Sequence, residues 1–330
     1  MRPAGSDQPP RGRRALRGFT DLTPVHSGEL WTIYRAVDVE FQMPVSLRVS
    51  RAATVPTYLV EELAAEMEIL ARMEPHPNIV RVLRFERWRN GSGVVVTELC
   101  RQSVAERLAQ SGPFPAPEAF TVGRAVAAAV AAAHSHGLVH GEVRPQCILV
   151  TRAGNPALGG FGMAALRRAT RTSGTPVDPH VAPETFKGEQ VGPPADVYGL
   201  GSTIYELVSG RPPFRAFAGE TPASFILRKI GDTPPRLSEP GIPVVMVDLI
   251  DACLSQDPAS RPSTTDMAAA LASVEFTQPV EHSTPPPVDA EAATPSPAGI
   301  GAARPAVTGP IAGSRNVVEP IAERPRTIGG

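Results

Sequence analysis

Lysine is nearly absent from this sequence, because only Lys187 and Lys229 stand among its 32 Lys and Arg residues. A site that needs an ammonium group before residue 187 therefore has no lysine to use. Cysteine is also scarce: Cys100, Cys147 and Cys253 lie far apart and form no C-x-x-C pair. This spacing argues against a structural zinc site and predicts a reducing, cytoplasmic setting. The formal net charge of −1 argues against a global basic field that would recruit nucleic acid or a membrane.

Long hydrophobic runs are missing as well. The longest uncharged stretch, residues 125–141, is mainly Ala with three His, which predicts a helix in a globular core and no membrane span. Residues 1–18 are rich in Arg, Pro and Gly, so we expect a flexible basic head instead of a secretory signal. Residues 277–330 contain ten Pro and no aromatic residue, which predicts a disordered Pro/Ala-rich tail.

Between these ends, the hydrophobic pattern changes from strands to helices. Alternating and apolar runs predict strands at 31–39, 44–50 and 94–99. Leu59, Leu63, Leu70 and Met73 recur at helical spacing and predict a helix over 57–73. Further helices are expected at 116–137, 194–209 and 243–254. The order predicts an α+β fold of two lobes, a small β-rich N-lobe over about 19–98 and a helical C-lobe over about 101–275.

Ordered motifs along residues 19–275 carry a family resemblance. They are "IYRAVD" at 33–38, "VSLRV" at 45–49, "HPNIVRVL" at 76–83, "VAPE" at 181–184, "DVYGLG" at 196–201 and "DPASRP" at 257–262. In this order they resemble the motifs of the eukaryotic-type Ser/Thr protein kinases that bacteria also encode. The resemblance implies the two-lobed protein-kinase fold, and it implies ATP-dependent phosphotransfer as the activity of the family.

Residues that build the frame of that family are present. Asp196 stands at the start of a hydrophobic helix and is able to cap it. The resemblance implies that its carboxylate binds the backbone of the catalytic loop, and a plain N-cap stays open as the alternative. Glu184 and Arg261 match the buried carboxylate–guanidinium pair of the C-lobe. The internal stack that joins the lobes is matched by Leu70, His140 and Phe161.

Residues that perform the chemistry of that family are replaced. In "HGEVRPQCILV", residues 140–150, Glu142 stands at the position of the base, Arg144 at that of the lysine and Cys147 at that of the metal-binding Asn. Gly160 replaces the metal-binding Asp of the D-F-G triplet. A thiol is a poor ligand for Mg²⁺, which prefers oxygen donors. We therefore expect no functional catalytic residue and no metal site.

The nucleotide-cleft positions of the N-lobe depart from the family too. Only Gly28 remains of the glycine-rich loop, where Glu29 adds negative charge and Trp31 either crowds a phosphate or plugs the cleft. Arg48 replaces the strand lysine. Its expected partner in a structural ion pair is Glu66, with Glu62 as the competing choice. The remaining matched cleft positions are Thr97 and Glu98.

These losses predict a pseudokinase, a catalytically inactive kinase-like domain that acts as a signalling scaffold or binding module without a cofactor. Two alternatives stay open. One is a weakly active or unusual ATP-dependent Ser/Thr protein kinase that uses Glu142, Arg48, ATP and Mg²⁺. The other is a switch that binds a nucleotide without metal.

Several threonines suggest that the chain accepts phosphate. The candidate sites are Thr170, Thr172, Thr175, Thr277 and Thr308. Expected partners are signalling proteins: an active Ser/Thr kinase that modifies these residues and a forkhead-associated-domain protein that binds the product. The alternative is that these threonines reflect only the ordinary composition of such a tail and have no function as phosphate acceptors.

Overall fold

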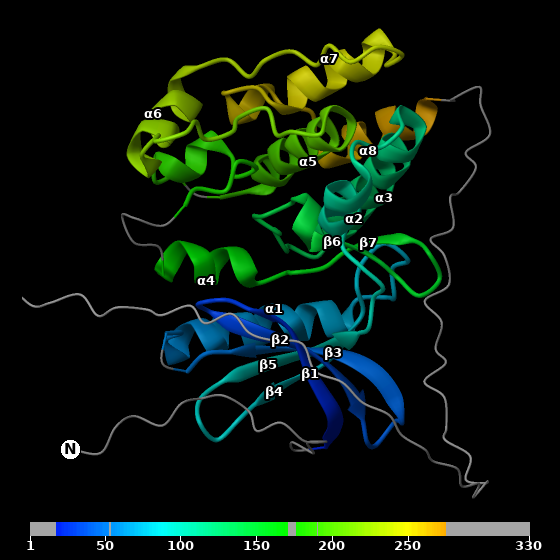
Figure 1. The fold of residues 1–330 in the computed structure, drawn as a ribbon, viewed down its shortest axis with the longest axis vertical. Coiled ribbons are helices and arrows are strands. Elements are labelled where there is room, and N and C mark those ends of the chain that lie inside the picture. The colour runs from blue at the N-terminus through cyan, green and yellow to red at the C-terminus, as the bar shows by residue number, and fades with distance from the viewer. Residues whose placement is uncertain (1–17, 53, 171–175, 190, 275–330) are drawn as a thin grey trace, which may run out of the picture. The chain divides into compact units, whose positions relative to one another are not determined.

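The structure, a computed structural model, describes residues 18–52, 54–170, 176–189 and 191–274. The chain divides into two units, Met1–Glu281 and His282–Gly330, and the second unit lies outside the described residues. Residues 1–17 of the predicted head and all of the predicted tail 277–330 lie outside them as well. The described part of the first unit contains a sheet-rich lobe and a helical lobe (Figure 1), which confirms the predicted fold class.

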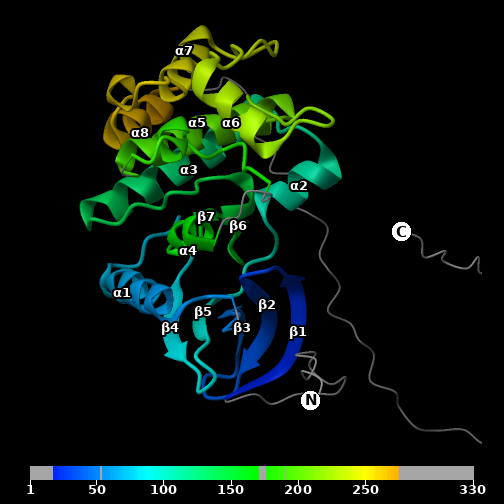
Figure 2. The same cartoon turned by 90° about the vertical axis from the view of Figure 1, so that its left-hand side faces the viewer.

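The N-lobe is built on a five-stranded antiparallel sheet with the order β1-β2-β3-β5-β4. Helix α1 (Thr57–Arg72) packs beside this sheet (Figure 2). In the register, Arg48 of β3 pairs with Ile33 on one side and Val95 on the other, so the centre of the sheet positions its side chain. The strands are β1 (Phe19–Ser27), β2 (Trp31–Asp38), β3 (Met43–Ser50), β4 (Val82–Arg87) and β5 (Gly93–Glu98).

Helix α1 is amphipathic and turns one face toward the core. Leu59, Leu63 and Leu70 are buried on it as predicted, together with Val60 and Met67. Burial of such side chains stabilises the fold by about 1.5–3 kcal/mol each. Met73 lies just past the end of the helix, where its backbone is extended, and it packs half-buried against the same core.

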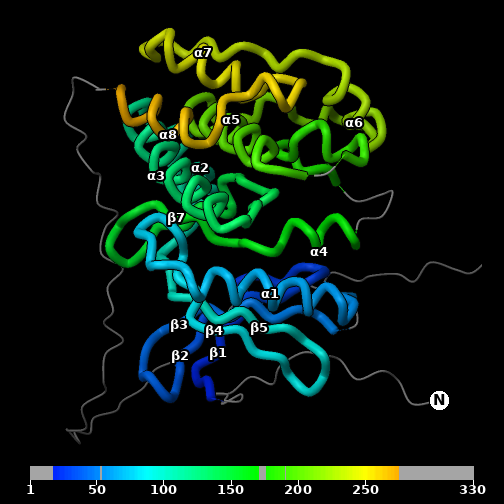
Figure 3. Tube along the Cα trace, turned by 180° about the vertical axis from the view of Figure 1, so that it is seen from behind, coloured from blue at the N-terminus to red at the C-terminus, as the bar shows by residue number. Residues whose placement is uncertain are grey.

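The C-lobe packs its helices around α3 and α5 (Figure 3). Helix α5 approaches its neighbours closely because two glycines lie on it. A Cβ on Gly199 would lie 2.7 Å from the carbonyl oxygen of Val143, and one on Gly201 would lie 2.6 Å from Cβ of Cys253. Gly199 therefore lets α5 approach the loop that carries the site, and Gly201 lets it approach α7. The helices are α2 (Val104–Ser111), α3 (Ala116–Ser135), α4 (Met163–Thr170), α5 (Pro193–Ser209), α6 (Pro222–Gly231), α7 (Val244–Cys253) and α8 (Thr264–Ser273), with a small hairpin of β6 (Ile148–Val150) and β7 (Pro156–Leu158).

The three predicted strands and four predicted helices are present as β2, β3, β5, α1, α3, α5 and α7, with their ends within two residues of the predictions. The three apolar residues that end the stretch 140–150 form the strand that their pattern predicts, β6, whereas β1, β4, β7, α2, α4, α6 and α8 were not predicted. Of these, α4 changes the site most. In the described part of the chain, no helix combines the length and the apolar character needed to cross a membrane.

Candidate functional site

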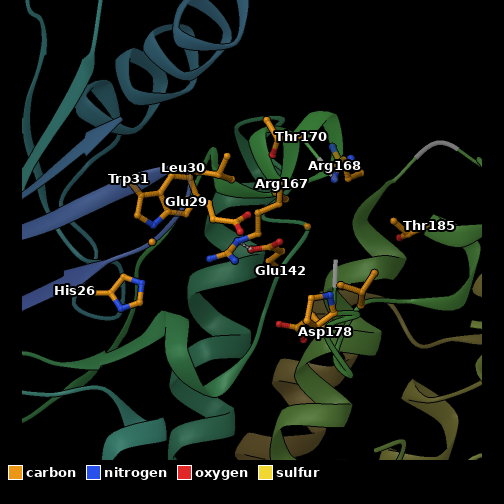
Figure 4. Close-up of a pocket in the computed structure, with 15 residues that line it drawn as sticks. His26, Glu29, Leu30, Trp31, Glu142, Arg167, Arg168, Thr170, Asp178 and Thr185 are labelled. Atoms are coloured by element: carbon orange, nitrogen blue, oxygen red, sulfur yellow. Dashed lines mark ion pairs between the residues drawn. The ribbon is translucent and has the colours of Figure 1, made fainter. Parts of the chain in front are cut away.

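A pocket of about 290 Å³ opens between the turn that follows β1, the catalytic-loop residues Gly141 and Glu142, helix α4 and the segment 176–185. Figure 4 shows that Trp31 enters it from the N-lobe, while Arg167 of α4 reaches toward Glu142. Asp178 lies on the far side. The pocket thus lies at the catalytic-loop residues that the sequence predicts. Helix α4, which the sequence did not predict, forms one of its walls.

Asp196 holds the catalytic loop in place. Its carboxylate accepts hydrogen bonds from the backbone N–H groups of His140 at 2.8 Å and Gly141 at 2.6 Å, and it contacts Nε2 of His134 at 2.8 Å. The plain N-cap interpretation is wrong, because α5 begins at Pro193 and its N-cap is Gly192. Two prolines at the first helical positions start the helix earlier, since proline is pre-organised for the first turn.

His140 and Phe161 lie in contact, with ring centroids 4.7 Å apart in a T-shaped arrangement. Burial lowers the pKa of His140, which keeps the imidazole neutral. The backbone N–H of Glu142 donates to Nδ1 at 3.2 Å, so the proton resides on Nε2, which donates to the carbonyl of Gly159 at 3.0 Å. This neutral ring ties the catalytic loop to the segment that carries Gly160. Leu70 belongs to the same hydrophobic core as Phe161.

Glu142 is enclosed by guanidinium groups. Nε of Arg167 lies 2.9 Å from its Oε2, as an ion pair in which the N–H does not point at the oxygen. Nη2 of Arg144 lies 3.9 Å from the same oxygen, and Arg144 makes its closer ion pair with Asp178. Burial raises the pKa of Glu142, and the two guanidinium groups oppose that shift. The Glu142 carboxylate thus lies between the guanidinium groups of Arg167 and Arg144.

Trp31 lies against two guanidinium groups. The guanidinium carbon of Arg167 is 5.1 Å from the centroid of the Trp31 ring system, and that of Arg48 is 5.7 Å from it, both within the range of a cation–π contact. Trp31 is 5 % exposed, so its ring system is buried against these groups while one edge lines the pocket. The N–H of Gly28 donates to the carbonyl of Trp31 at 2.9 Å, which closes the turn before it.

Arg48 and Glu66 form no ion pair, so the predicted pair is wrong; both residues lie in the described part of the chain. The reason is α4, which lies next to α1 in Figures 1, 2 and 3. A Cβ on Gly162, just before α4, would lie 2.4 Å from Cδ1 of Leu63 and 3.3 Å from Oε2 of Glu66. Burial raises the pKa of Glu66, and the guanidinium group of Arg168 acts against that shift. Glu62 makes no ion pair with Arg48 either.

Cys147 and Gly160 meet at the two positions where the family has metal ligands. A Cβ on Gly160 would lie 3.3 Å from Sγ of Cys147. Burial raises the pKa of Cys147, so the thiol is neutral at pH 7, and neither residue offers a side-chain oxygen. This donor set does not fit Mg²⁺, which requires oxygen ligands. Among the residues with described positions, no group of three His, Cys, Asp or Glu side chains could hold a metal ion.

Glu184 and Arg261 lie in contact in the C-lobe. Nη1 donates to Oε1 at 2.7 Å and Nη2 donates to Oε2 at 2.8 Å, so the guanidinium group binds the carboxylate with both nitrogens. Both residues are buried. Arg261 also donates to the carbonyl groups of Pro194 and Ser255 at 2.9 Å each. The pair therefore joins the residues that precede α5 to the loop that precedes α8.

Of the other predicted site residues, Gly28 and Thr170 line the pocket, whereas Thr97 and Glu98 do not. Thr97 donates to the carbonyl of Glu98 at 3.2 Å, and the Glu98 carboxylate accepts from the N–H of Arg81 at 2.9 Å. Thr170, at the end of α4, donates to the carbonyl of Leu166 at 2.7 Å. The remaining candidate phosphosites, Thr172, Thr175, Thr277 and Thr308, lie outside the described residues.

Sequence reasoning missed Arg167 and Asp178 as parts of the site. A signal for Arg167 exists: "MAALRRAT" at 163–170 is rich in helix-forming residues and follows the Gly160-Phe161-Gly162 triplet directly. No local sequence pattern marks Asp178 as a site residue. Asp178 reaches the site because the segment before α5 folds back, so that its carboxylate accepts a hydrogen bond from Arg144.

Comparison with known families gives the same assignment as the fold and the loop geometry. The family model described as the protein kinase domain matches residues 19–271. The chain belongs to the protein kinase domain family.

Similar sequences within this family carry names of bacterial kinases. The chain is 28 % identical over 253 residues to the serine/threonine-protein kinase PknK of Mycobacterium tuberculosis, covering 75 % of this chain and 22 % of that protein. It is 30 % identical over 292 residues to the serine/threonine-protein kinase PkaA of Streptomyces coelicolor, covering 82 % of this chain and 50 % of that protein. It is 31 % identical over 277 residues to the serine/threonine-protein kinase PknA of M. tuberculosis, covering 80 % and 63 %. The chain thus spans less than two thirds of each relative.

The fold is similar to that of a solved kinase domain. The crystal structure of the M. tuberculosis PknI kinase domain matches with a TM-score of 0.61 and 22 % sequence identity, over 78 % of this chain and 97 % of that chain. This likeness supports the fold alone.

Proposed function

We propose that this protein kinase domain acts as a binding module in signalling and does not transfer phosphate with a divalent metal ion. The observation that supports this proposal is that Cys147 and Gly160 lie side by side. Gly160 has no side chain, and a Cβ built on it would lie 3.3 Å from Sγ of Cys147. Phosphoryl transfer depends on metal ions that bridge the phosphates and neutralise the developing charge. A neutral thiol and a glycine supply neither the charge nor the oxygen atoms for that task.

The state of Glu142 supports the same proposal. Its carboxylate lies in an ion pair with Arg167 and close to Arg144. A general base must lie within hydrogen-bond reach of the proton that it removes. Here the guanidinium group of Arg167 occupies one side of the carboxylate, so a substrate hydroxyl on that side would have to displace the Arg167 side chain first. Loss of a positioned base costs about 10²–10⁴ in rate.

The second candidate function is that of an ATP-dependent Ser/Thr protein kinase, weakly active or with unusual chemistry. The similarity to relatives named serine/threonine-protein kinases favours it. Glu142 keeps a carboxylate at the position of the base, and burial raises its pKa toward the range in which a base works best near neutral pH. Under this candidate, release of Arg167 from Glu142 would precede turnover.

Labelled ATP separates the two candidates. We expect no incorporation of labelled phosphate into the protein or into a generic basic substrate, with Mg²⁺ or with Mn²⁺. Metal-dependent incorporation that is lost in Glu142→Ala and retained in Glu29→Ala would establish the kinase and reject the binding module. Glu29 is a matched control because it lines the same pocket from the N-lobe.

The candidate threonines suggest which proteins would bind this module. We propose that an active Ser/Thr kinase modifies the chain and that a forkhead-associated-domain protein binds the product, since a phosphate adds charge that an Arg-lined pocket recognises. Thr170 is half-buried and hydrogen-bonded within α4, so its modification requires that the end of the helix opens. Phosphosite mapping after co-expression with such a kinase tests this, and Ala at all five candidate threonines should abolish capture of the partner.

A further inference from the structure

A second pocket, of about 280 Å³, lies in the C-lobe where the end of α5 meets α6 and the loop before α7 (Figure 1). It shares no lining residue with the candidate functional site. Arg211, Arg215 and Arg228 line it, and none of the described residues that line it is acidic. Tyr205 and Phe217 add aromatic surface. The pocket therefore combines positive charge with apolar walls.

Arg228 is already neutralised, and it holds an aromatic ring in place. Its Nε donates to Oε1 of Glu220 at 2.9 Å and its Nη2 donates to Oε2 at 2.8 Å, so both carboxylate oxygens are bound. Its guanidinium carbon lies 4.2 Å from the ring centroid of Phe217, which is a cation–π contact. The backbone N–H of Phe217 also donates to Oε2 of Glu220 at 2.9 Å. Phe217 is nevertheless 58 % exposed, so a fixed aromatic side chain faces solvent at the pocket.

Arg211 and Arg215 carry the unpaired positive charge of the pocket. Both are exposed, and in the described part of the chain neither guanidinium group has an ion-pair or hydrogen-bond partner. Their hydrogen bonds there involve backbone atoms: the carbonyl of Arg215 accepts from Nη2 of Arg228 at 2.8 Å, and the N–H of Arg211 donates to Oγ of Ser209 at 3.4 Å. Positive charge at the pocket is thus in excess.

Three carboxylates lie near the pocket without lining it, and each already has a partner. Glu220 pairs with Arg228. Asp251 pairs with Arg236, and Glu239 accepts from a neighbouring backbone N–H at 3.1 Å. The two exposed guanidinium groups of the pocket therefore remain available for an anion from outside the described chain.

The backbone between these two arginines is pre-organised. Arg211 and Arg215 are separated by Pro212, Pro213 and Phe214, and each proline ring fixes φ at about −65°. Phe214 is 3 % exposed and anchors the segment. A segment that is already ordered loses little conformational freedom when a ligand binds, which favours tight binding.

We propose that this pocket binds a phosphorylated Ser or Thr side chain in an extended segment of a partner protein. Arg211 and Arg215 face the phosphate, and the ring of Phe217 contacts an apolar side chain beside it. The phosphate carries nearly two negative charges near neutral pH, which match the two unpaired guanidinium groups. Each planar guanidinium fork is able to donate two parallel hydrogen bonds to phosphate oxygens, and arginine clusters recognise phosphorylated peptides in this way.

The fixed ring favours a peptide over a free phosphate ion, because an inorganic ion has no apolar group to bury against it. The excess charge favours a phosphate over a carboxylate, which carries one negative charge instead of nearly two. The inference goes beyond the proposed function, because the pocket lies outside the candidate functional site and serves a partner whether or not the domain transfers phosphate.

The test is a titration of the full chain, followed by fluorescence anisotropy, with labelled peptides that differ at one position: Ala-Ala-pThr-Leu-Ala-Ala, its unmodified Thr form and its Glu form. The ionic strength is held constant, because salt screens contacts between exposed charges. We expect saturable binding of the phosphopeptide and affinities lower by about tenfold or more for the other two peptides. Inorganic phosphate should displace the phosphopeptide only at much higher concentration.

Three variants and a control locate the site. Arg211→Gln and Arg215→Gln should each weaken binding by about tenfold while the protein stays folded, because both side chains are exposed. Arg124→Gln on α3 is the matched control, since it removes the same charge from an exposed residue that does not line the pocket, and it should bind as the parent does. Phe217→Ala should abolish the preference for Leu over Ala after the phosphothreonine and retain displacement by inorganic phosphate.

The proposal is overturned if the Thr or Glu peptide binds as tightly as the phosphopeptide, or if inorganic phosphate does. It is also overturned if both arginine variants bind as the parent does, if Arg124→Gln loses as much affinity as they do, or if Phe217→Ala keeps the preference for Leu. None of these measurements depends on phosphate transfer. The labelled-ATP experiment tests the proposed function separately, so failure of one is distinguishable from failure of the other.

Discussion

Nε of Arg167 lies 2.9 Å from Oε2 of Glu142, and this ion pair joins α4 to the catalytic loop. The same helix packs on α1, where the residue before it, Gly162, comes close to Leu63 and Glu66. One placement of α4 therefore accounts for two features of the cleft: the engaged carboxylate at the position of the base and the separation of Glu66 from Arg48.

Replacement of Arg167 tests how much this ion pair stabilises the fold. Arg167→Gln leaves the Glu142 carboxylate, whose side chain is 7 % exposed, with Arg144 at a longer distance. Because the Arg167 side chain is 38 % exposed and partly screened, we expect a loss of about 1–2 kcal/mol in unfolding free energy at pH 8. The loss should shrink toward pH 5 as Glu142 takes up a proton, since burial already raises its pKa. Urea denaturation measures both values.

The control for this experiment is Arg168→Gln on the same helix, where the side chain is exposed and a smaller loss is expected. Equal losses for the two variants at both pH values would contradict the importance of the Arg167–Glu142 contact.

Removal of Arg261 should be far more costly. Arg261→Gln leaves the buried Glu184 carboxylate without its guanidinium partner, and breaking a buried pair on one side costs about 3–5 kcal/mol. The matched control is Arg236→Gln, because Arg236 is 57 % exposed and pairs at the surface with Asp248 and Asp251. An exposed pair of this kind contributes about 0–1 kcal/mol. Similar unfolding midpoints for the two variants would count against the clamp.

Lys229 predicts a pH dependence of stability. It is fully buried on α6 and donates to the carbonyl of Pro179 at 2.6 Å and the hydroxyl of Tyr198 at 3.0 Å. Burial lowers its pKa to about 7, while Asp178 and Glu184 oppose the shift. Above that pH the native state loses the proton that the unfolded state retains. Stability from this group should therefore rise by about 1.4 kcal/mol per pH unit from about pH 7 to about pH 10.

The measurement compares urea midpoints of the parent and Lys229→Met between pH 6 and pH 9.5. The difference between the two isolates the lysine, because the other titrating groups are common to both. Parallel curves would show that Lys229 keeps an ordinary pKa in the native state.

The three thiols should resist alkylation in the native protein. Burial raises the pKa of Cys100 to about 12 and that of Cys253 to about 12, and it also raises that of Cys147. At pH 8 a thiol with that pKa is ionised to about one part in ten thousand, so iodoacetamide should react about a thousand times more slowly than with a free cysteine. Protein unfolded in urea, in which all three should react, provides the reference. Rapid modification of any one in the native state would refute the raised pKa of that thiol.

Much of the fold was predictable because it rests on local patterns. The stripe of Leu59, Leu63 and Leu70 and the apolar run 94–99 specify α1 and β5 without long-range information. The partnership of Glu184 and Arg261, 77 residues apart, was accessible only through the family motifs that contain them. No local pattern links two residues at that separation.

The cleft was predictable only in part, because its geometry depends on tertiary packing. Family spacing suggested Glu66 as the partner of Arg48, but spacing cannot report that α4 packs against α1 and brings Gly162 beside Glu66. The alternative interpretation of Asp196 as an N-cap failed for a local reason, since Pro193 and Pro194 begin the helix before it. In both cases the sequence showed which residues are present, but it did not show the backbone conformation that positions them.

Trp31 gives the molecule an optical probe of its own. It is one of two tryptophans in the chain, and its ring system lies against the guanidinium groups of Arg167 on α4 and Arg48 on β3. Departure of α4 would change the charge beside the indole and the access of water to it. With Trp88→Phe as background, the fluorescence emission of this single side chain would report that event in unlabelled protein.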